Sequence, residues 1–205
     1  MTVATSSIPV LETERLRLRA FAPPDALRVQ QLAGDARVAE TTASIPHPYP
    51  DGTAVKWFAA HGPSAANGTG VTWPIESKDD ALVIGAISLL CAERHARGES
   101  GYWLGAAYWN RGYTTKAARR VIQHGFEHHR LHRIQSQAML GNPGSWQVME
   151  KSGMQREGIL RGISNGARRS RTSSGTRCFP TIGLPSFPPQ VDGDSRSFLS
   201  STCLA

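Results

Sequence analysis

The sequence predicts a three-layer α/β fold, in which helices cover both faces of a central β-sheet. Helix-like and strand-like patterns alternate along most of the chain, which is typical of this class. Residues 82–90 are apolar at nearly every position, so we expect a central strand that is buried on both faces. A glycine-bearing turn at Gly112 leads from a strand into a strongly amphipathic helix.

The first half of the chain is expected to supply three strands and two helices. Arg15–Arg19 alternates strictly between arginine and leucine, which predicts a strand with one face on the core and one in solvent. Two prolines end this strand, and a helix is expected over residues 25–34, with Gly34 at its end. The next elements are a proline-rich loop Pro46–Gly52, a helix Thr53–His61, a loop 62–70, and strands 71–76 and 82–90.

The second half continues the alternation up to about residue 163. In the helix after Gly112, His124 falls with the charged residues on the face opposite the apolar one. Asn142 has the chemistry of a helix N-cap, and Pro143 follows it in the first turn. The apolar helix face is formed by Ala118, Val121, Ile122, Gly125 and Phe126. The other elements expected are a charged loop Glu93–Ser100 and strands Gly101–Leu104, Leu131–Met139 and Met154–Gly158.

The chain is expected to form one folded domain over residues 10–163, after a flexible lead-in at residues 1–9. Residues 164–205 hold 9 Ser, 4 Pro and 4 Gly but no Lys or Glu. Such a composition does not readily offset the entropy cost of folding, so we expect a disordered tail. The sheet is then expected to lack its last strand and to have an open edge.

Charge and cysteine content exclude few functions. The formal net charge of +7 suits a polyanionic cofactor as well as nucleic acid, and nucleic-acid binding through Arg161–Arg177 would rest on charge alone. Cys91, Cys178 and Cys203 show no paired spacing, so neither disulfides nor a metal knuckle is expected. No stretch is apolar and long enough to span a bilayer. We therefore expect a cytoplasmic protein without a membrane partner.

The turn Arg111–Thr115 has the chemistry of a phosphate-binding loop. Backbone N–H groups at the start of a helix lack intrahelical partners and lie at the positive end of the helix dipole. Gly112 lets the backbone approach a ligand closely, and Arg111 adds a positive charge. An ordinary strand-to-helix connection shows the same pattern, so the surrounding sequence is needed to distinguish it from a phosphate-binding loop.

That surrounding sequence resembles the GCN5-related N-acetyltransferase (GNAT) superfamily, in particular its ribosomal-protein N-terminal acetyltransferases. The resemblance runs from about Leu11 to Leu160 and implies an α/β/α sandwich with a mixed central sheet. It rests on stretches that follow one another in the family's order: Leu11–Arg19, Gly101–Gly105, Tyr108–Ala118, and Asn142–Ser145 with Glu150–Met154 and Glu157–Gly158.

The resemblance implies an N-acetyltransferase in which a primary amine attacks acetyl-CoA directly within a ternary complex. The acceptor expected first is a protein N-terminal α-amine, and a peptide or small amine is the wider class. For catalysis, the resemblance implies that the Leu104 N–H contacts the thioester carbonyl and that Ser145 supplies a proton to the sulfur, although a helix cap would explain Ser145 as well. No metal is implied, and a homodimer is left open. The implied cofactor-binding residues are Leu104, Arg111, Gly112, Tyr113, Thr114, Thr115, Asn142 and Ser145.

Several positions depart from the family pattern. Thr114 stands where the closest branch has a small residue, and Trp109 stands where the superfamily has Gln or Arg. The Thr114 hydroxyl could donate to a phosphate, and Lys116 adds a nearby cation. Gln135 stands where many members carry a glutamate that accepts the proton of the amine. The base is then water or one of the remaining titratable candidates, Glu99, Glu76 and His47.

These departures leave a second function open, a catalytically impaired module that binds acyl-CoA without turnover. Gln135, Thr114 and the expected loss of the last strand favour it. Four histidines could share a metal ion at helical spacing, but no Cys or acidic cluster accompanies them, so we expect a polar helix face instead. These histidines are His124, His128, His129 and His132.

Overall fold

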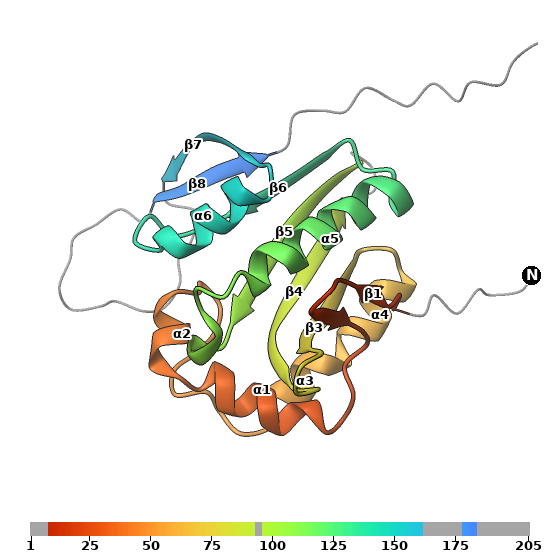
Figure 1. The fold of residues 1–205 in the computed structure, drawn as a ribbon, viewed down its shortest axis with the longest axis vertical. Coiled ribbons are helices and arrows are strands. Elements are labelled where there is room, and N and C mark those ends of the chain that lie inside the picture. Colours follow the sequence, from red (N-terminus) through yellow and green to blue (C-terminus); the bar gives the residue numbers. More distant parts are fainter. Residues whose placement is uncertain (1–7, 93–95, 162–177, 184–205) are drawn as a thin grey trace, which may run out of the picture.

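The structure is a computed structural model that describes residues 8–92, 96–161 and 178–183. Its middle layer is an eight-stranded sheet in the order β1-β2-β3-β4-β5-β6-β8-β7 (Figure 1). The strands are β1 Leu11–Glu12, β2 Leu16–Leu18, β3 Gly70–Ser77, β4 Val83–Ala92, β5 Arg97–Leu104, β6 Arg133–Gln137, β7 Gln155–Arg161 and β8 Cys178–Gly183.

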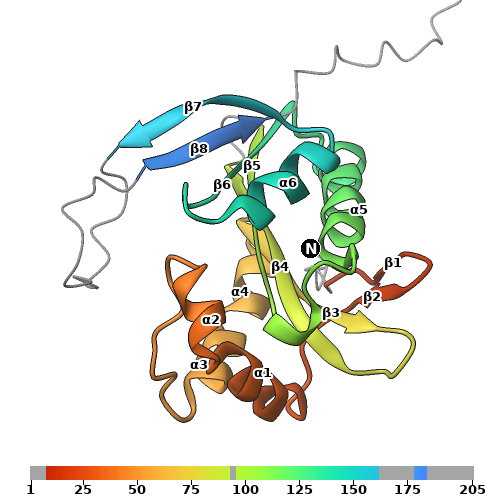
Figure 2. The ribbon, with the colours of Figure 1, turned by 60° about the vertical axis from the view of Figure 1, so that its left-hand side comes forward.

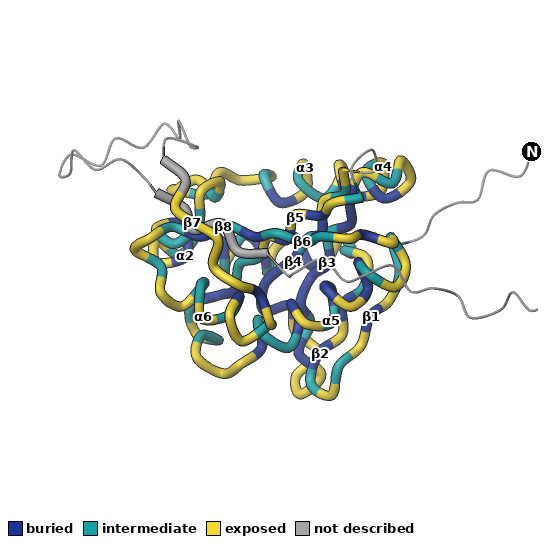
Figure 3. The backbone as a smooth tube through the Cα atoms, turned by 90° about the horizontal axis from the view of Figure 1, so that it is seen from above, coloured by how far each residue is buried: buried dark blue, intermediate teal, exposed yellow. Residues whose placement is uncertain are grey.

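Helices cover both faces of this mixed sheet, which confirms the predicted three-layer α/β/α fold. The helices α5 and α6 lie on one face, and α3 and α4 lie on the opposite face (Figures 2 and 3). None of the helices that the structure describes is long and apolar enough to cross a membrane. The helices are α1 Asp25–Ala33, α2 Ala36–Glu40, α3 Thr53–Ala59, α4 His61–Ala66, α5 Tyr113–His128 and α6 Pro143–Lys151.

The sheet is interrupted between β5 and β6. β5 pairs with β4 in antiparallel fashion along its whole length, from Arg97 to Leu104. Its parallel pairing with β6 covers three residues and ends where Glu99 lies opposite Gln135. Along its other edge, β6 pairs with β8 from Gln135 to Gln137. The last residues of β5 therefore have no neighbouring strand on the β6 side.

The core lies between the sheet and α5. Trp73, Leu89 and Ile134 are fully buried there. α5 approaches the sheet closely at Gly125, where an added Cβ would lie 2.7 Å from Ile134 Cδ1 and 3.0 Å from Leu89 Cδ2. The assignment of His124 to the polar face of this helix is wrong, because the side chain is buried and its ring packs edge-on against Trp73.

Some element boundaries differ from those predicted. The predicted loop 62–70 is helical at its start, because α4 continues to Ala66; Pro63 fits there since the first turn of a helix needs no N–H from it. The predicted charged loop Glu93–Ser100 already contains the start of β5, at Arg97. The short elements β1 and α2 were not predicted.

The prediction that the sheet lacks its last strand is wrong. β8 pairs with β6 on one side and with β7 on the other, both in antiparallel fashion. The sequence signal was weak because Pro180 lies within this strand and lacks an N–H, and because the surrounding composition is rich in serine. The rest of the segment 164–205 lies outside the described residues, as does the predicted lead-in up to residue 7.

Two buried histidines have ring nitrogens without a hydrogen-bond partner among the described residues, both nitrogens of His61 and Nδ1 of His124. His61 lies in a cluster of aromatic rings with Phe21, Trp57 and Phe58. Burial lowers the pKa of His61 to about 4. Burial also lowers the pKa of His124 to about 4, and neighbouring cationic side chains add to the effect.

These histidines should make the stability fall in mild acid. Their folded-state pKa values lie below the value of about 6.5 expected in the unfolded chain, so unfolding takes up protons between about pH 6.5 and pH 4. The free energy of unfolding should decrease over this range, by about 1 kcal/mol per histidine at pH 5 after allowance for solvent screening. Urea unfolding followed by circular dichroism should show a shallower pH dependence for His61→Phe than for the wild type. Equal slopes for the two proteins would contradict this account.

Candidate functional site

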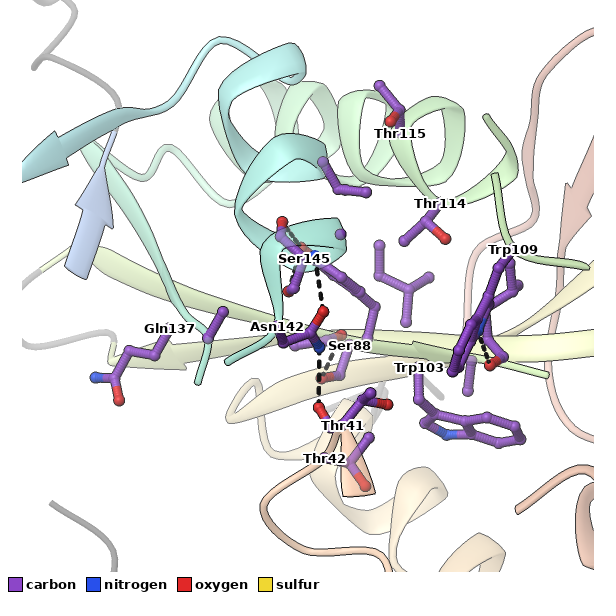
Figure 4. A pocket seen from close by; sticks show the side chains of 18 of the residues that line it. Thr41, Thr42, Ser88, Trp103, Trp109, Thr114, Thr115, Gln137, Asn142 and Ser145 are labelled. Carbon is purple, nitrogen blue, oxygen red and sulfur yellow. Dashed lines mark hydrogen bonds between the residues drawn. The ribbon is translucent and has the colours of Figure 1, made fainter. Parts of the chain in front are cut away.

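A cavity of about 920 Å³ opens where β5 and β6 separate. Its volume is in the range of ligand-binding pockets. The starts of α5 and α6 and the segment after α2 surround it (Figure 4). Arg111 is not among its lining residues, whereas all the other predicted cofactor-binding residues line it: Leu104, Gly112, Tyr113, Thr114, Thr115, Asn142 and Ser145.

The start of α5 offers backbone N–H groups to this cavity. Gly112 is the N-cap, with φ 77° and ψ 2°, and no side chain caps the helix. The N–H of Lys116 donates to the Gly112 carbonyl. The N–H groups of Tyr113, Thr114 and Thr115 therefore precede the first helical hydrogen bond and have no acceptor within the helix. They lie at the positive end of a 16-residue helix dipole, an arrangement that binds anions.

The larger side chains of this loop are engaged with the protein itself. The Arg111 guanidinium lies 5.8 Å from the centre of the Tyr108 ring. The Lys116 ammonium lies 2.9 Å from a carboxylate oxygen of Glu14. The Tyr113 side chain is buried in the core. Of these three residues only Tyr113 lines the cavity, and because its side chain is buried in the core, it presents chiefly its backbone there.

The Leu104 N–H points away from β4. The next residue, Gly105, donates its N–H to the Ile84 carbonyl, and successive residues of a strand direct their backbone groups to opposite sides. The Leu104 N–H is therefore directed to the β6 side, where β5 has lost its partner strand. The same alternation is visible at Ser100, whose carbonyl accepts a hydrogen bond from the Ser136 hydroxyl on β6.

Trp109 contacts the other backbone group of Leu104, the carbonyl. The indole Nε1 donates to the Leu104 carbonyl over 2.8 Å (Figure 4). The sequence showed Trp109 only as a departure from the family pattern. The contact could not be predicted, because it depends on how the loop folds back on the end of β5.

Asn142 and Ser145 begin α6 and are linked to two other elements. Asn142 Oδ1 accepts from the Ser145 N–H, which confirms the predicted N-cap, and Nδ2 donates to the Thr41 carbonyl after α2. The Tyr102 hydroxyl on β5 donates to the Ser145 carbonyl and lies 3.0 Å from Ser145 Oγ. A phenol has one proton, so in this arrangement Ser145 is the donor in the second contact. Tyr102 was not predicted as a site residue.

Burial holds the pKa of the Tyr102 phenol well above its usual value, and the hydrogen bond with Ser145 opposes this only in part. Tyr102 therefore remains protonated at neutral pH and can donate. The two hydroxyl groups form a short chain at the border of the cavity, with Ser145 as the member on α6.

The three titratable candidates for a base occupy different environments. Glu99 lines the cavity and is its one carboxylate among the described residues; Gln135 Nε2 lies 3.4 Å from Glu99 Oε2. Glu76 lies outside the cavity lining and forms an ion pair with Arg19 at 2.6 Å. His47 does not line the cavity either. Within the described ranges, no group of three or more His, Cys, Asp or Glu residues could hold a metal ion.

Comparison with known proteins defines the class. The Acetyltransferase (GNAT) domain matches residues 15–155. The chain therefore belongs to the GNAT acetyltransferase family, as its sequence motifs predicted. It is similar to YoaA of Bacillus subtilis, an uncharacterized N-acetyltransferase, with 30% identity over 159 residues that cover 75% of this chain and 86% of that protein. The family and the names of the relatives make this chain an enzyme of the acetyltransferase class.

Solved structures agree with the fold. The ribosomal L7/L12 α-N-protein acetyltransferase RimL in complex with coenzyme A has a TM-score of 0.75 at 14% identity, covering 87% of this chain and 98% of that one. A spermidine N-acetyltransferase from Vibrio cholerae, in complex with CoA and spermine, has a TM-score of 0.68 at 16% identity, covering 84% and 96%. At such identities the likeness concerns the fold alone.

We predict that Gly112→Val weakens coenzyme A binding by about ten-fold or more, measured by calorimetry. An added Cβ at Gly112 meets no protein atom within 4 Å, so the side chain would project into free space beside the helix N–H groups. The positive φ of 77° also strains any residue with a side chain.

Gly52 provides a matched control for the strain. It is the N-cap of α3 with φ 73° and ψ −2°, an added Cβ there also meets no atom, and it does not line the cavity. Gly112→Val and Gly52→Val should lose similar stability, about 1–3 kcal/mol, whereas only the former should lose affinity. Equal affinities for the two variants would remove the α5 N-terminus from the binding site.

Proposed function

We propose that this protein transfers the acetyl group of acetyl-CoA to the α-amine of a protein or peptide N-terminus. The amine attacks the thioester directly while both reactants are bound. The observation that carries this proposal is the Leu104 N–H, which is directed into the opening between β5 and β6. The same cavity contains the free N–H groups at the start of α5. The Leu104 N–H suits a carbonyl oxygen, and the N–H groups at the start of α5 suit a diphosphate.

The described residues fit an acyl-CoA molecule. The N–H groups of Tyr113, Thr114 and Thr115 would bind its pyrophosphate, and the Thr114 hydroxyl would be a further donor. Asn142 and Ser145 would border the pantetheine arm, since they line the cavity on the side of α6. When bound, acetyl-CoA supplies the activated thioester.

Leu104 would stabilise the charge that develops on the carbonyl oxygen as the amine adds. A donor that is fixed before the reaction needs no reorganisation, and such donors are worth about 10²–10³-fold in rate. The hydrogen bond from Trp109 to the Leu104 carbonyl supports this role, because it restrains the residue whose N–H donates.

Ser145 would donate a hydrogen bond to the leaving sulfur. The Tyr102 hydroxyl, 3.0 Å from Ser145 Oγ, would then turn from the backbone carbonyl and donate to Ser145. The raised pKa of Tyr102 keeps the phenol protonated for this purpose. Together the pair would limit the charge on the thiolate as the C–S bond breaks.

An α-amine is the acceptor that best suits a site with a weak base. The pKa of an α-amine is about 7.7–8.0, whereas that of a lysine side chain is about 10.4, so a far larger fraction of α-amines is neutral near pH 7.5. Gln135 cannot take up the amine proton usefully, and Glu99 lies five residues from Leu104 on β5. Water in the open cavity would therefore carry the proton to solvent. RimL, an α-N-protein acetyltransferase of ribosomal L7/L12, shares the fold.

The test is an acetyl-CoA assay in which coenzyme A release and acetylated product are followed by chromatography and mass spectrometry. The acceptors are a peptide with a free N-terminus, the same peptide with a blocked N-terminus and one internal lysine, and spermidine. We expect turnover with the free α-amine and little with the others. Turnover restricted to spermidine or to the lysine peptide would contradict the proposed acceptor.

A second candidate, an acyl-CoA-binding module without turnover, is favoured by one observation, the amide of Gln135 beside the cavity where a carboxylate would serve as a base. The same assay separates the two functions. Calorimetric binding of acetyl-CoA without coenzyme A release from any acceptor would support the module and contradict the enzyme.

We predict that Ser145→Ala lowers kcat by about ten-fold to a hundred-fold and changes the Kd for acetyl-CoA by less than about three-fold. The hydrogen bond to sulfur matters mainly as the C–S bond breaks, so its loss affects turnover more than binding. Ser145→Thr, which keeps a hydroxyl, should recover part of the rate. Parallel losses of affinity and turnover in Ser145→Ala would instead assign Ser145 to the structure of the α6 N-terminus.

A further inference from the structure

The two charged side chains that line the cavity, Glu99 and Lys151, lie on opposite faces of the sheet. Among the described residues, Glu99 on β5 is the one carboxylate that lines the cavity, and Lys151 on α6 is the one lysine or arginine. No ion pair of Glu99 is found within 4 Å in the described part of the chain, and its side-chain hydrogen bond comes from neutral Gln135. The Glu99 carboxylate is therefore available to a cation that enters from solvent.

Alternation along β5 places Glu99 on the face opposite α5. Gly98 and Ser100 are buried, and a Cβ at Gly98 would lie 2.7 Å from the core residue Leu131. Glu99 and Gly101 are exposed and belong to the other face. Trp103, the next residue on that face, packs with the small apolar cluster of α1 and α3. Glu99 thus faces the layer opposite the helix whose N-terminus would bind the pyrophosphate.

Distance excludes a direct contact between Glu99 and the reacting amine. Leu104 and Glu99 are five residues apart on one strand, which corresponds to roughly 17 Å. A glutamate side chain spans only a fraction of this length. A cation bound by Glu99 is therefore a second group of the acceptor, separate from the amine that attacks the thioester near the Leu104 N–H.

Gly101 has no side chain, so the sheet surface between Glu99 and Leu104 is open at this residue. An added Cβ at Gly101 would meet one atom within 4 Å, Ser88 Oγ at 3.4 Å, and Gly101 lines the cavity. Thr72 and Ser88 lie beside it in register on β3 and β4 and also line the cavity. These three residues form a row across the sheet, which a chain running along β5 would cross at Gly101. The face of β5 that carries Trp103, Gly101 and Glu99 is here called the β5 track, and at Gly101 it presents no side chain to an extended chain.

We propose that the acceptor is a peptide that lies along the β5 track, with Glu99 binding a lysine or arginine side chain at about position 3 to 5 of the peptide, counted from the reacting N-terminal residue. An extended peptide covers roughly 17 Å in five residues, and the long side chain of a basic residue shortens this requirement. Arg97, two residues before Glu99 on the same face of β5, lines a smaller adjoining cavity together with Glu99 and Gln135 but does not line the main cavity, so a cation would reach Glu99 from the side of Gly101. The inference rests on the proposed acetyl transfer to an α-amine.

The test is a lysine scan with neutral octapeptides that have a free N-terminus and one lysine at position 2, 3, 4, 5 or 6. For the wild type, kcat/KM should exceed that of the matching glutamine peptide by about two-fold to five-fold when the lysine is at positions 3 to 5. The preference should disappear in Glu99→Gln and at 0.5 M salt, and Glu99→Lys should prefer glutamate at the same positions. Glu127→Gln, which neutralises an exposed carboxylate on α5, should keep the wild-type preference.

A second variant tests the path of the peptide without changing charge. Gly101→Val should lower kcat/KM for the octapeptide by about ten-fold and lower it less for alanine amide, which does not reach Gly101. A flat lysine scan in the wild type, an unchanged preference in Glu99→Lys, or equal losses on long and short acceptors would overturn the inference. If alanine amide and all peptides fail as acceptors of the wild type, the proposed function itself fails; a flat scan with active acceptors removes only the role of Glu99 and the β5 track.

Discussion

The early end of the pairing between β5 and β6 is the constraint on which the site depends. The antiparallel ladder with β4 uses the backbone groups of alternate residues of β5, and the remaining groups need another partner. Beyond Glu99 that partner is not a strand, so the N–H groups of Tyr102 and Leu104 are directed into the cavity. If β6 continued beside β5, the same N–H groups would be consumed by the sheet and no donor would remain for a carbonyl oxygen.

The charged residues around the loop form contacts within the protein, so under the proposed function anion binding would be left to the backbone. Arg28 donates to the Tyr108 hydroxyl and to the Val83 carbonyl, and Lys116 pairs with Glu14. A site built from N–H groups depends on backbone geometry more than on side-chain identity. This accounts physically for the departures of Trp109 and Thr114 from the family pattern, because the change of side chain leaves the positions of the N–H groups intact.

The parts of the fold that sequence could predict are those whose signal is local. The alternation at Arg15–Arg19, the stripe along α5 and the cap of α6 each arise within one element, and each was found in the structure. β8 was missed because its pairing is decided by two distant strands that both need a neighbour. His124 was misassigned because helical spacing gives a direction, whereas burial depends on Trp73 in another element. The start of β5 was hidden by Gly98 and Ser100, which are small because the core lies close to them.

In the candidate site, too, the features within one element could be predicted from the sequence, whereas the contacts between elements could not. The spacing from Leu104 to Gly112 and from Asn142 to Ser145 could be read from the chain, but the contacts of Tyr102 with Ser145 and of Trp109 with Leu104 join separate elements. If the proposed function holds, the register of β5 would allow one strand to contact both reactants. Its free N–H groups point into the gap, Tyr102 points to α6, and the exposed residues point to the opposite layer. A shift of β5 by one residue against β4 would exchange these faces and turn the Leu104 N–H back into the ladder, so the same register that builds the core also determines the chemistry of the cavity.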